Sequence, residues 1–207
     1  MTGKVAIIED ADDAAVARWL AGRRAEGFAT QPGPVAIAVP GGATPFPIIA
    51  ALLGADLPWD RLIVWPTDDR IVAEDHPASN TGRLRALFTP AGASVVALAE
   101  GTAPPRFALT WLGMGADGHI ASLFPSADPR ADDSCAVIRL TPDPLPPEAP
   151  FPRITLTIPA LLACEEILIV ARGADKRAVL DRSRAGRVDT PLARLLAAAR
   201  QPVTCFT

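Results

Sequence analysis

The sequence predicts an α/β fold with a mostly parallel sheet that helices cover on both faces. Three observations support this prediction. Short apolar runs alternate along the chain with segments of helical pattern. Most of these runs are continuous Val, Ile, Leu and Ala, which is typical of strands buried on both sides. The 207 residues are 49% hydrophobic, which is enough for a sizeable core in a single domain spanning 1–207.

The apolar runs define the expected strands, which we place at 5–8, 35–39, 62–65, 95–98, 107–112, 136–140, 154–157 and 167–171. Helical patterns lie between most of them. Acidic residues of the kind that cap helices open the first, and Pro45, Pro159 and Pro191 stand at first-turn positions of three others, where a missing N–H costs nothing. We therefore expect helices at 11–26, 45–53, 80–87, 159–164, 175–184 and 191–199.

One segment, 141–152, reads TPDPLPPEAPFP and contains six prolines in twelve residues. This composition predicts a polyproline or turn conformation. Only some 55 residues follow it, few for an independent domain, so we interpret it as a surface loop within one domain.

Charge and cysteine content argue against several functional classes. The net charge is −3, with 20 basic and 23 acidic residues interspersed, which favours neither nucleic acid nor a membrane surface as partner. The three cysteines include no CxxC pair and are expected to be reduced thiols. The N-terminus turns acidic after four apolar residues, unlike a signal peptide, and no apolar run approaches the roughly 20 residues of a membrane span. We expect a soluble, cytoplasmic protein that is a monomer or a dimer.

Four of the predicted strands are followed by glycine turns or charged groups. The segments are PGGATP after 35–39, PTDDR after 62–65, GMGADGH after 107–112 and RGADK after 167–171. Ligands of open α/β sheets bind beyond the carboxyl ends of the strands. The four segments together therefore predict a ligand site at this edge of the sheet.

The first of these segments has the features of an anion site. Gly41 and Gly42 allow a ligand to approach the backbone closely, Thr44 stands at an N-cap position, and Pro45 opens the helix. Free N–H groups and the positive end of a helix favour an anion such as phosphate. The segment is neither a GK[ST] P-loop nor a GxGxxG dinucleotide loop.

Basic side chains near the same edge would complement such an anion. Arg70 offers a planar fork, and Lys176 offers a point charge in the first turn of its helix, where a ligand anion would offset the unfavourable dipole. Arg153 stands at the start of its strand, so it reaches this edge only if that strand runs antiparallel to the others.

His119, one of two histidines, lies in the glycine-rich turn GMGADGH. Histidine is the side chain most often used as a base near neutral pH, and Asp117 lies two residues before it, where it would orient the imidazole. The N–H groups of the glycine turn are suited to stabilising developing negative charge. With two distant histidines, no Cys pair and no HExxH, we expect no metal site.

Several segments taken together resemble the glucosamine-6-phosphate isomerase/6-phosphogluconolactonase family, and within it the lactonase branch. The segments are VPGGATP, WPTDDRIVAEDHPASN, LGMGADGHIASLFP, RITLTIPALL and ARGADK, in that order. The resemblance implies a Rossmann-like domain that hydrolyses 6-phospho-D-glucono-1,5-lactone to 6-phosphogluconate in the oxidative branch of the pentose phosphate pathway, without a cofactor. It makes His119 the general base, with Asp117 beside it. The substrate or phosphate positions that it implies are Gly41, Gly42, Thr44, Asp68, Arg70, Asn80, Gly115, Arg153 and Lys176.

The chain departs from the family pattern in three places. Pro40 stands where a serine is common before the two glycines, Asp69 replaces a glutamate in the TDER motif, and the connection over 98–107 is short. The first two changes bear on how the substrate is positioned.

Two other functions remain open at this point. The deaminase branch carries GHIAFNEP, with a glutamate shortly after the histidine, whereas here no acid follows His119 until Asp128. A non-catalytic sugar-phosphate sensor would keep the phosphate loop and the cations but would not need the His119–Asp117 pair. The residues present favour the lactonase.

Overall fold

The computed structural model describes residues 5–147 and 149–207. Its main element is a seven-stranded sheet in which every pair of neighbouring strands is parallel. In spatial order the strands are β1 (Val5–Ile8), β10 (Val203–Phe206), β9 (Ile167–Val170), β6 (Leu109–Leu112), β2 (Val35–Val39), β3 (Leu62–Pro66) and β5 (Ser94–Val95).

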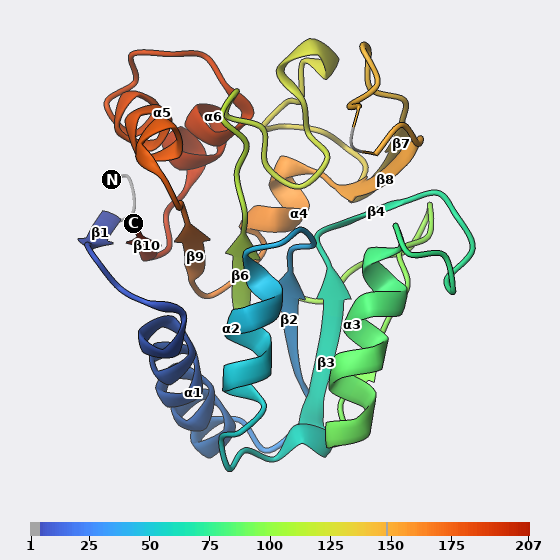
Figure 1. Cartoon of the computed structure of the whole chain (residues 1–207), viewed down its shortest axis with the longest axis vertical. Helices are drawn as coiled ribbons and strands as arrows, with labels where there is room; N and C mark the ends of the chain where they lie inside the picture. Colours follow the sequence, from blue (N-terminus) through green and yellow to red (C-terminus); the bar gives the residue numbers. More distant parts are fainter. Residues whose placement is uncertain (1–4, 148) are drawn as a thin grey trace.

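Three further strands form a small antiparallel sheet in the order β4 (Asp68–Arg70), β8 (Arg153–Leu156), β7 (Val137–Leu140). β4 follows β3 after a single residue, so the chain passes directly from the large sheet into the small one. Figure 1 shows the small sheet beyond the carboxyl end of β3.

Helices cover both faces of the large sheet (Figure 1). One face carries α1 (Asp13–Thr30), α2 (Pro45–Leu52) and α3 (Asn80–Phe88), and the other carries α4 (Ile158–Leu162), α5 (Ala174–Arg184) and α6 (Pro191–Ala198). Short 3₁₀ turns lie at Trp59–Arg61, Thr89–Ala91 and Pro125–Ala127.

Side chains of the central strands alternate between two cores. In β2, Ala36 and Ala38 join the core beneath α4, α5 and α6, whereas Val35, Ile37 and Val39 join the core beneath α1, α2 and α3. All five are buried, which explains why the strand reads as a continuous apolar run. The expected α/β class with helices on both faces is confirmed.

A buried ion pair fastens α1 to the start of β9. The Arg24 guanidinium donates to the Glu166 carboxylate at 2.6 Å, and the two side chains are 5% and 8% exposed. Arg23 donates to the other carboxylate oxygen at 2.9 Å. Desolvation by burial lowers the pKa of Arg24, although Glu166 opposes the shift.

The predicted elements differ from the observed ones in a few places. All six helices are present, but the run expected to form a strand at 95–98 gives only the two-residue β5. We did not predict β4, whose residues are polar, or β10, which lies at the C-terminal end of the described chain. The loop expected at 141–152 contains neither helix nor strand over 141–147 and 149–152, and its Glu148 lies outside the described residues.

The cysteines are free thiols, as expected. Cys135 is exposed, whereas Cys164 and Cys205 are buried. Burial raises the pKa of both buried thiols, that of Cys205 to about 12, so both stay protonated at neutral pH. Within the described residues, no helix is long and apolar enough to cross a membrane.

Candidate active site

A cleft of about 240 Å³ opens at the carboxyl ends of β2 and β6. From these two neighbouring strands the chain order runs outward in opposite directions, to β3 and β5 on one side and to β9 and β10 on the other, where β1 forms the edge. Such a reversal leaves a crevice between the loops that leave the two strands, and this is where open α/β sheets bind ligands. The cleft therefore lies at the edge of the sheet where the sequence predicts a ligand site.

The turn from β2 to α2 forms one wall. Gly41, Gly42 and Thr44 line the cleft, as expected from the sequence, and Gly42 adopts a positive φ of 94°. A Cβ on Gly41 would stand 2.0–2.3 Å from the side-chain amide of Asn80, so only glycine fits there. Thr44 occupies the N-cap position of α2, but its side chain makes no capping hydrogen bond.

The loop after β6 carries His119 to the cleft. Its backbone folds back on itself, because Gly115 N–H donates to His119 O at 2.9 Å and Gly118 N–H donates to Gly115 O at 3.1 Å. The His119 N–H donates to the Asp117 carboxylate at 3.1 Å. These three N–H groups of the turn are thus already engaged within it, which argues against the expectation that they stabilise charge on a ligand.

Asp117 holds the His119 ring. Its carboxylate oxygen lies 2.7 Å from Nδ1, and Asp117 itself does not line the cleft. The hydrogen bond from His119 lowers the pKa of Asp117, partly opposed by desolvation, so this carboxylate is ionised at neutral pH. An ionised acceptor at Nδ1 favours the tautomer with the proton on Nδ1, which leaves Nε2 as the basic nitrogen.

The glycines of this loop are required by close packing. A Cβ on Gly115 would meet His119 Nδ1 at 2.2 Å and Asp117 Oδ1 at 2.5 Å. Gly118 has a φ of 81°, and a Cβ there would lie 2.7 Å from Thr190, directly before α6. The two residues let the loop wrap tightly around the imidazole and against α6.

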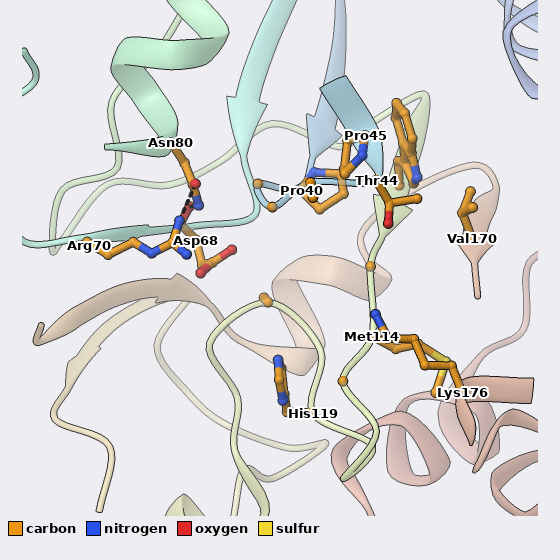
Figure 2. Close-up of a pocket in the computed structure, with 17 residues that line it drawn as sticks. Pro40, Thr44, Pro45, Asp68, Arg70, Asn80, Met114, His119, Val170 and Lys176 are labelled. Atoms are coloured by element: carbon orange, nitrogen blue, oxygen red, sulfur yellow. Dashed lines mark hydrogen bonds between the residues drawn. The ribbon is translucent and has the colours of Figure 1, made fainter. Parts of the chain in front are cut away.

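A hydrogen-bonded group of polar side chains forms the opposite side of the cleft, where Asp68, Arg70 and Asn80 lie together in Figure 2. Ser122 Oγ donates to the Asp68 carboxylate at 2.5 Å, and Asn80 Nδ2 donates to the Asp68 carbonyl at 2.8 Å. The Arg70 guanidinium donates to Asn80 Oδ1. The network fixes the orientation of the Asp68 carboxylate and the Arg70 fork before any ligand binds.

Asp69, adjacent to this group, faces α3 and not the cleft. Its carboxylate accepts the backbone N–H groups of Asn80 at 2.6 Å and Thr81 at 2.9 Å, and the Ser79 hydroxyl at 3.2 Å. It therefore satisfies the first N–H groups of α3 and places Asn80 beside Arg70. Asp69, which is shorter than the glutamate of the family motif, therefore has a structural role at the start of α3.

Arg153, like Asp117, is a predicted site residue that does not line the cleft, but whereas Asp117 holds the ring of His119, the Arg153 side chain bonds to residues outside the cleft. β8 does run antiparallel to β4, and Arg153 pairs in register with Arg70. Its guanidinium, however, donates to the carbonyls of Phe151 at 2.5 Å and Ala149 at 2.7 Å. Burial, followed by the charge of Arg70, lowers the pKa of Arg153. The side chain fastens the proline-rich loop to the small sheet.

Lys176 of α5 also lines the cleft. It belongs to the first turn of α5, which follows Gly173 with a φ of 91°. In Figure 2 its side chain extends into the cleft on the same side as Thr44, away from Arg70 and Asn80. The cleft therefore has one cation near the α2 turn and another near the Asp68 carboxylate.

Apolar residues of the cleft were not predicted as site residues. Met114, Trp111 and Val170 line it, as does Ala121, which has a positive φ of 49°. No sequence pattern marked them as functional, because an apolar side chain at a strand end is equally typical of a core. Within 5–147 and 149–207, no group of three or more His, Cys, Asp or Glu residues is arranged to hold a metal ion.

Nearly the whole chain is similar to the proteins of one family. The model of this family, described as glucosamine-6-phosphate isomerases/6-phosphogluconolactonase, matches residues 9–101 and 89–204. The chain belongs to this family. It is 34% identical to a 6-phosphogluconolactonase of Mesorhizobium japonicum over 90% of this chain and 88% of that protein. It is 33% identical to a 6-phosphogluconolactonase of Caulobacter vibrioides over 77% of this chain and 76% of that protein.

Solved structures of family members share the fold. The 6-phosphogluconolactonase of Thermotoga maritima superposes with a TM-score of 0.83 at 23% identity, covering 98% of this chain and 99% of that one. The enzyme of Trypanosoma brucei gives a TM-score of 0.81 at 23% identity, covering 99% and 96%. At this identity the likeness concerns the fold, and it extends over nearly the whole chain, the small antiparallel sheet included.

Proposed function

We propose that this chain hydrolyses 6-phospho-D-glucono-1,5-lactone to 6-phospho-D-gluconate, the lactonase step in the oxidative branch of the pentose phosphate pathway. The observation that supports this most is a single cleft, in a member of this family, that holds an oriented imidazole together with a helix N-terminus and a lysine. The curated relatives reported above are lactonases by name.

His119 is the proposed general base. Asp117 fixes its ring at 2.7 Å from Nδ1, which leaves Nε2 free to take a proton from a water molecule as that water attacks C1 of the lactone. The tetrahedral intermediate then collapses, the bond from C1 to the ring oxygen breaks, and the proton is returned to that oxygen. A positioned base of this kind contributes typically 10²–10⁴-fold in rate.

The substrate phosphate is proposed to lie between the α2 turn and Lys176. The backbone of Gly42 and Thr44 lines that part of the cleft, and the Lys176 ammonium extends toward it. Arg70 is held by Asn80 on the other side, where the Asp68 carboxylate is suited to accept hydrogen bonds from sugar hydroxyls. Arg153 has no proposed contact with substrate, because its guanidinium is engaged with backbone carbonyls.

Deamination of glucosamine 6-phosphate is the second candidate, and one contact argues against it. The first acid after His119 is Asp128, whose carboxylate accepts from Arg194 at 2.5 Å and does not line the cleft. A further acid–base group for ring opening is thus missing from the segment that follows the histidine. A sensor without activity is disfavoured because the His119–Asp117 pair is intact.

The direct test follows the loss of 6-phospho-D-glucono-1,5-lactone above its spontaneous hydrolysis, with glucosamine 6-phosphate assayed in parallel. We expect lactone turnover only. His119→Ala is expected to keep the fold and most of the binding while kcat falls about 10²–10⁴-fold. Deaminase turnover, or no acceleration of lactone loss by the parent protein, would overturn the proposal, and an unchanged kcat would remove His119 from the mechanism.

We propose that residues 1–207 act as one domain in the cytoplasm, with the sugar-phosphate lactone as partner and neither nucleic acid nor membrane. The shared core beneath α4, α5 and α6 supports a single domain, because it includes Val137 and Leu156 of the small sheet together with Ile167 and Ile169 of the large one.

A further inference from the structure

We infer that the indole N–H of Trp111 is a hydrogen-bond donor to the anionic end of the ligand, beside the α2 turn. This inference rests on the proposed function and adds a binding residue to it. Trp111 is 2% exposed, yet it lines the cleft. Its Nε1 is buried and has no hydrogen-bond partner among the described residues.

An unpartnered buried N–H is costly, so its position calls for an explanation. The polar side chains opposite it in the cleft are bonded already: Asp68 to Ser122, Asn80 to Arg70, and His119 to Asp117. The Nε of Arg70 is also buried without a partner among the described residues, but Arg70 lies beside Asp68 and Asn80, away from Thr44 and the α2 turn. Trp111 offers its unpartnered donor on the side of the α2 turn. A ligand oxygen in the cleft would satisfy it.

Strand register places the indole near the α2 turn. β6 pairs with β2 at Ile37↔Leu109 and Ala38↔Thr110, so Trp111 lies beside Val39, the last residue before that turn. Trp111 belongs to the same core as Val39, Ile48 and Ile49, and therefore its side chain is on the face of the sheet that α2 covers. It lies beneath the proposed phosphate position.

The α2 turn itself is poor in donors. Pro45 and Pro47 stand in the first turn of α2, and Pro40 precedes the two glycines, so three N–H groups that a different sequence would supply are missing. An anion bound here has fewer backbone partners than at most helix N-termini. A side-chain donor beneath the turn would compensate, and Trp111 is the buried side chain in position to provide it.

Trp65 is a matched control within the same sheet. Its Nε1 is also buried without a partner in the described part of the chain, but Trp65 lies on the opposite face, in the core beneath α4, α5 and α6, and does not line the cleft. A ligand in the cleft should therefore affect the indole of Trp111 and leave that of Trp65 unchanged.

The decisive experiment titrates the ¹⁵N-labelled 207-residue chain with inorganic phosphate and follows the indole N–H signals of its four tryptophans. Trp111→Phe and Trp65→Phe assign two of the signals. We expect the Trp111 signal to move downfield and saturate, with the Trp65 signal unchanged. A Trp111 signal that stays in place while phosphate binds, or an absence of phosphate binding, would overturn the inference.

Kinetics provide the second readout. A hydrogen bond to a charged group is lost in Trp111→Phe while the apolar volume is largely kept, so KM for the phosphorylated lactone should rise about ten- to hundredfold with a much smaller change in kcat. Trp65→Phe should leave KM unchanged. An unchanged KM in Trp111→Phe would refute the inference with the lactonase function intact, whereas a parent protein without lactonase activity would refute the function and leave the phosphate titration to decide on Trp111.

Discussion

Replacing Gly115 by alanine tests whether the glycines of the loop after β6 position the His119 ring. The new Cβ would lie 2.2 Å from Nδ1 and 2.3 Å from Cε1 of that ring, where ordinary contacts begin at 3.4 Å. It would also stand 2.5 Å from Asp117 Oδ1. The imidazole therefore has to move by more than an ångström, and its hydrogen bond to Asp117 has to lengthen or break.

The expected cost is in the rate and not in the fold. A misplacement of about 1 Å in a catalytic group costs roughly 10²-fold, which is about 2.7 kcal/mol on the activation barrier. Gly115 does not adopt a positive φ, so alanine introduces no backbone strain there. We expect kcat of Gly115→Ala to fall about 10²-fold, with little change in KM, because the phosphate position is formed by other residues.

The assay is steady-state lactone hydrolysis, corrected for the spontaneous reaction and accompanied by thermal unfolding. Gly22→Ala in α1 is the control, because its Cβ would meet nothing within 4 Å, and both its kcat and its fold should be preserved. A kcat of Gly115→Ala within about threefold of the parent would refute the reasoning, since it would mean that the position of the ring does not limit the reaction.

Three single substitutions test other parts of the structure. Lys176→Ala should raise KM about ten- to hundredfold for the phosphorylated lactone and leave an unphosphorylated lactone unaffected; equal effects on both would argue against the phosphate anchor. Asp117→Ala should lower the free energy of unfolding at pH 7. The hydrogen bond from His119 lowers the pKa of Asp117, so the ionised carboxylate stabilises the folded state at pH values above the usual pKa of an aspartate. This deficit should shrink as the pH falls below about 4, and urea unfolding that shows the same deficit at pH 3 would contradict it. Glu166→Ala leaves Arg24 buried without its counter-ion and should cost about 3–5 kcal/mol of stability in urea unfolding, with kcat unchanged in the folded protein; a loss below 1 kcal/mol would show that water reaches the pair.

The sequence was most informative where burial dictates the pattern. β2 and β9 are buried at every position, and their continuous apolar runs were recognised with correct starting residues. β4 was missed because Asp68, Asp69 and Arg70 have no apolar pattern; pairing with β8 and the contacts of Asp69 to α3 make it a strand. Those partners are distant in sequence, so no local signal predicts them.

In the candidate site, too, some features could be predicted from the sequence and others depend on tertiary contacts. Residues beside the strand ends, among them Gly42, His119 and Lys176, were predicted to meet, because the carboxyl ends of parallel strands share one edge, and the structure brings them to one cleft. The direction of the Arg153 side chain could not be predicted from the sequence. Its strand β8 is antiparallel to β4, as a position in the site would require, but its guanidinium donates to two backbone carbonyls. Trp111 was assigned to a strand correctly, but whether its N–H has a partner depends on tertiary contacts.

A crystal structure with bound 6-phosphogluconate would show how the cleft holds the product of the proposed reaction. We expect the phosphate between Thr44 and Lys176, and the C1 carboxylate within hydrogen-bond reach of His119 Nε2. A phosphate held instead by Arg70, or a C1 carboxylate out of reach of the imidazole, would contradict this expectation.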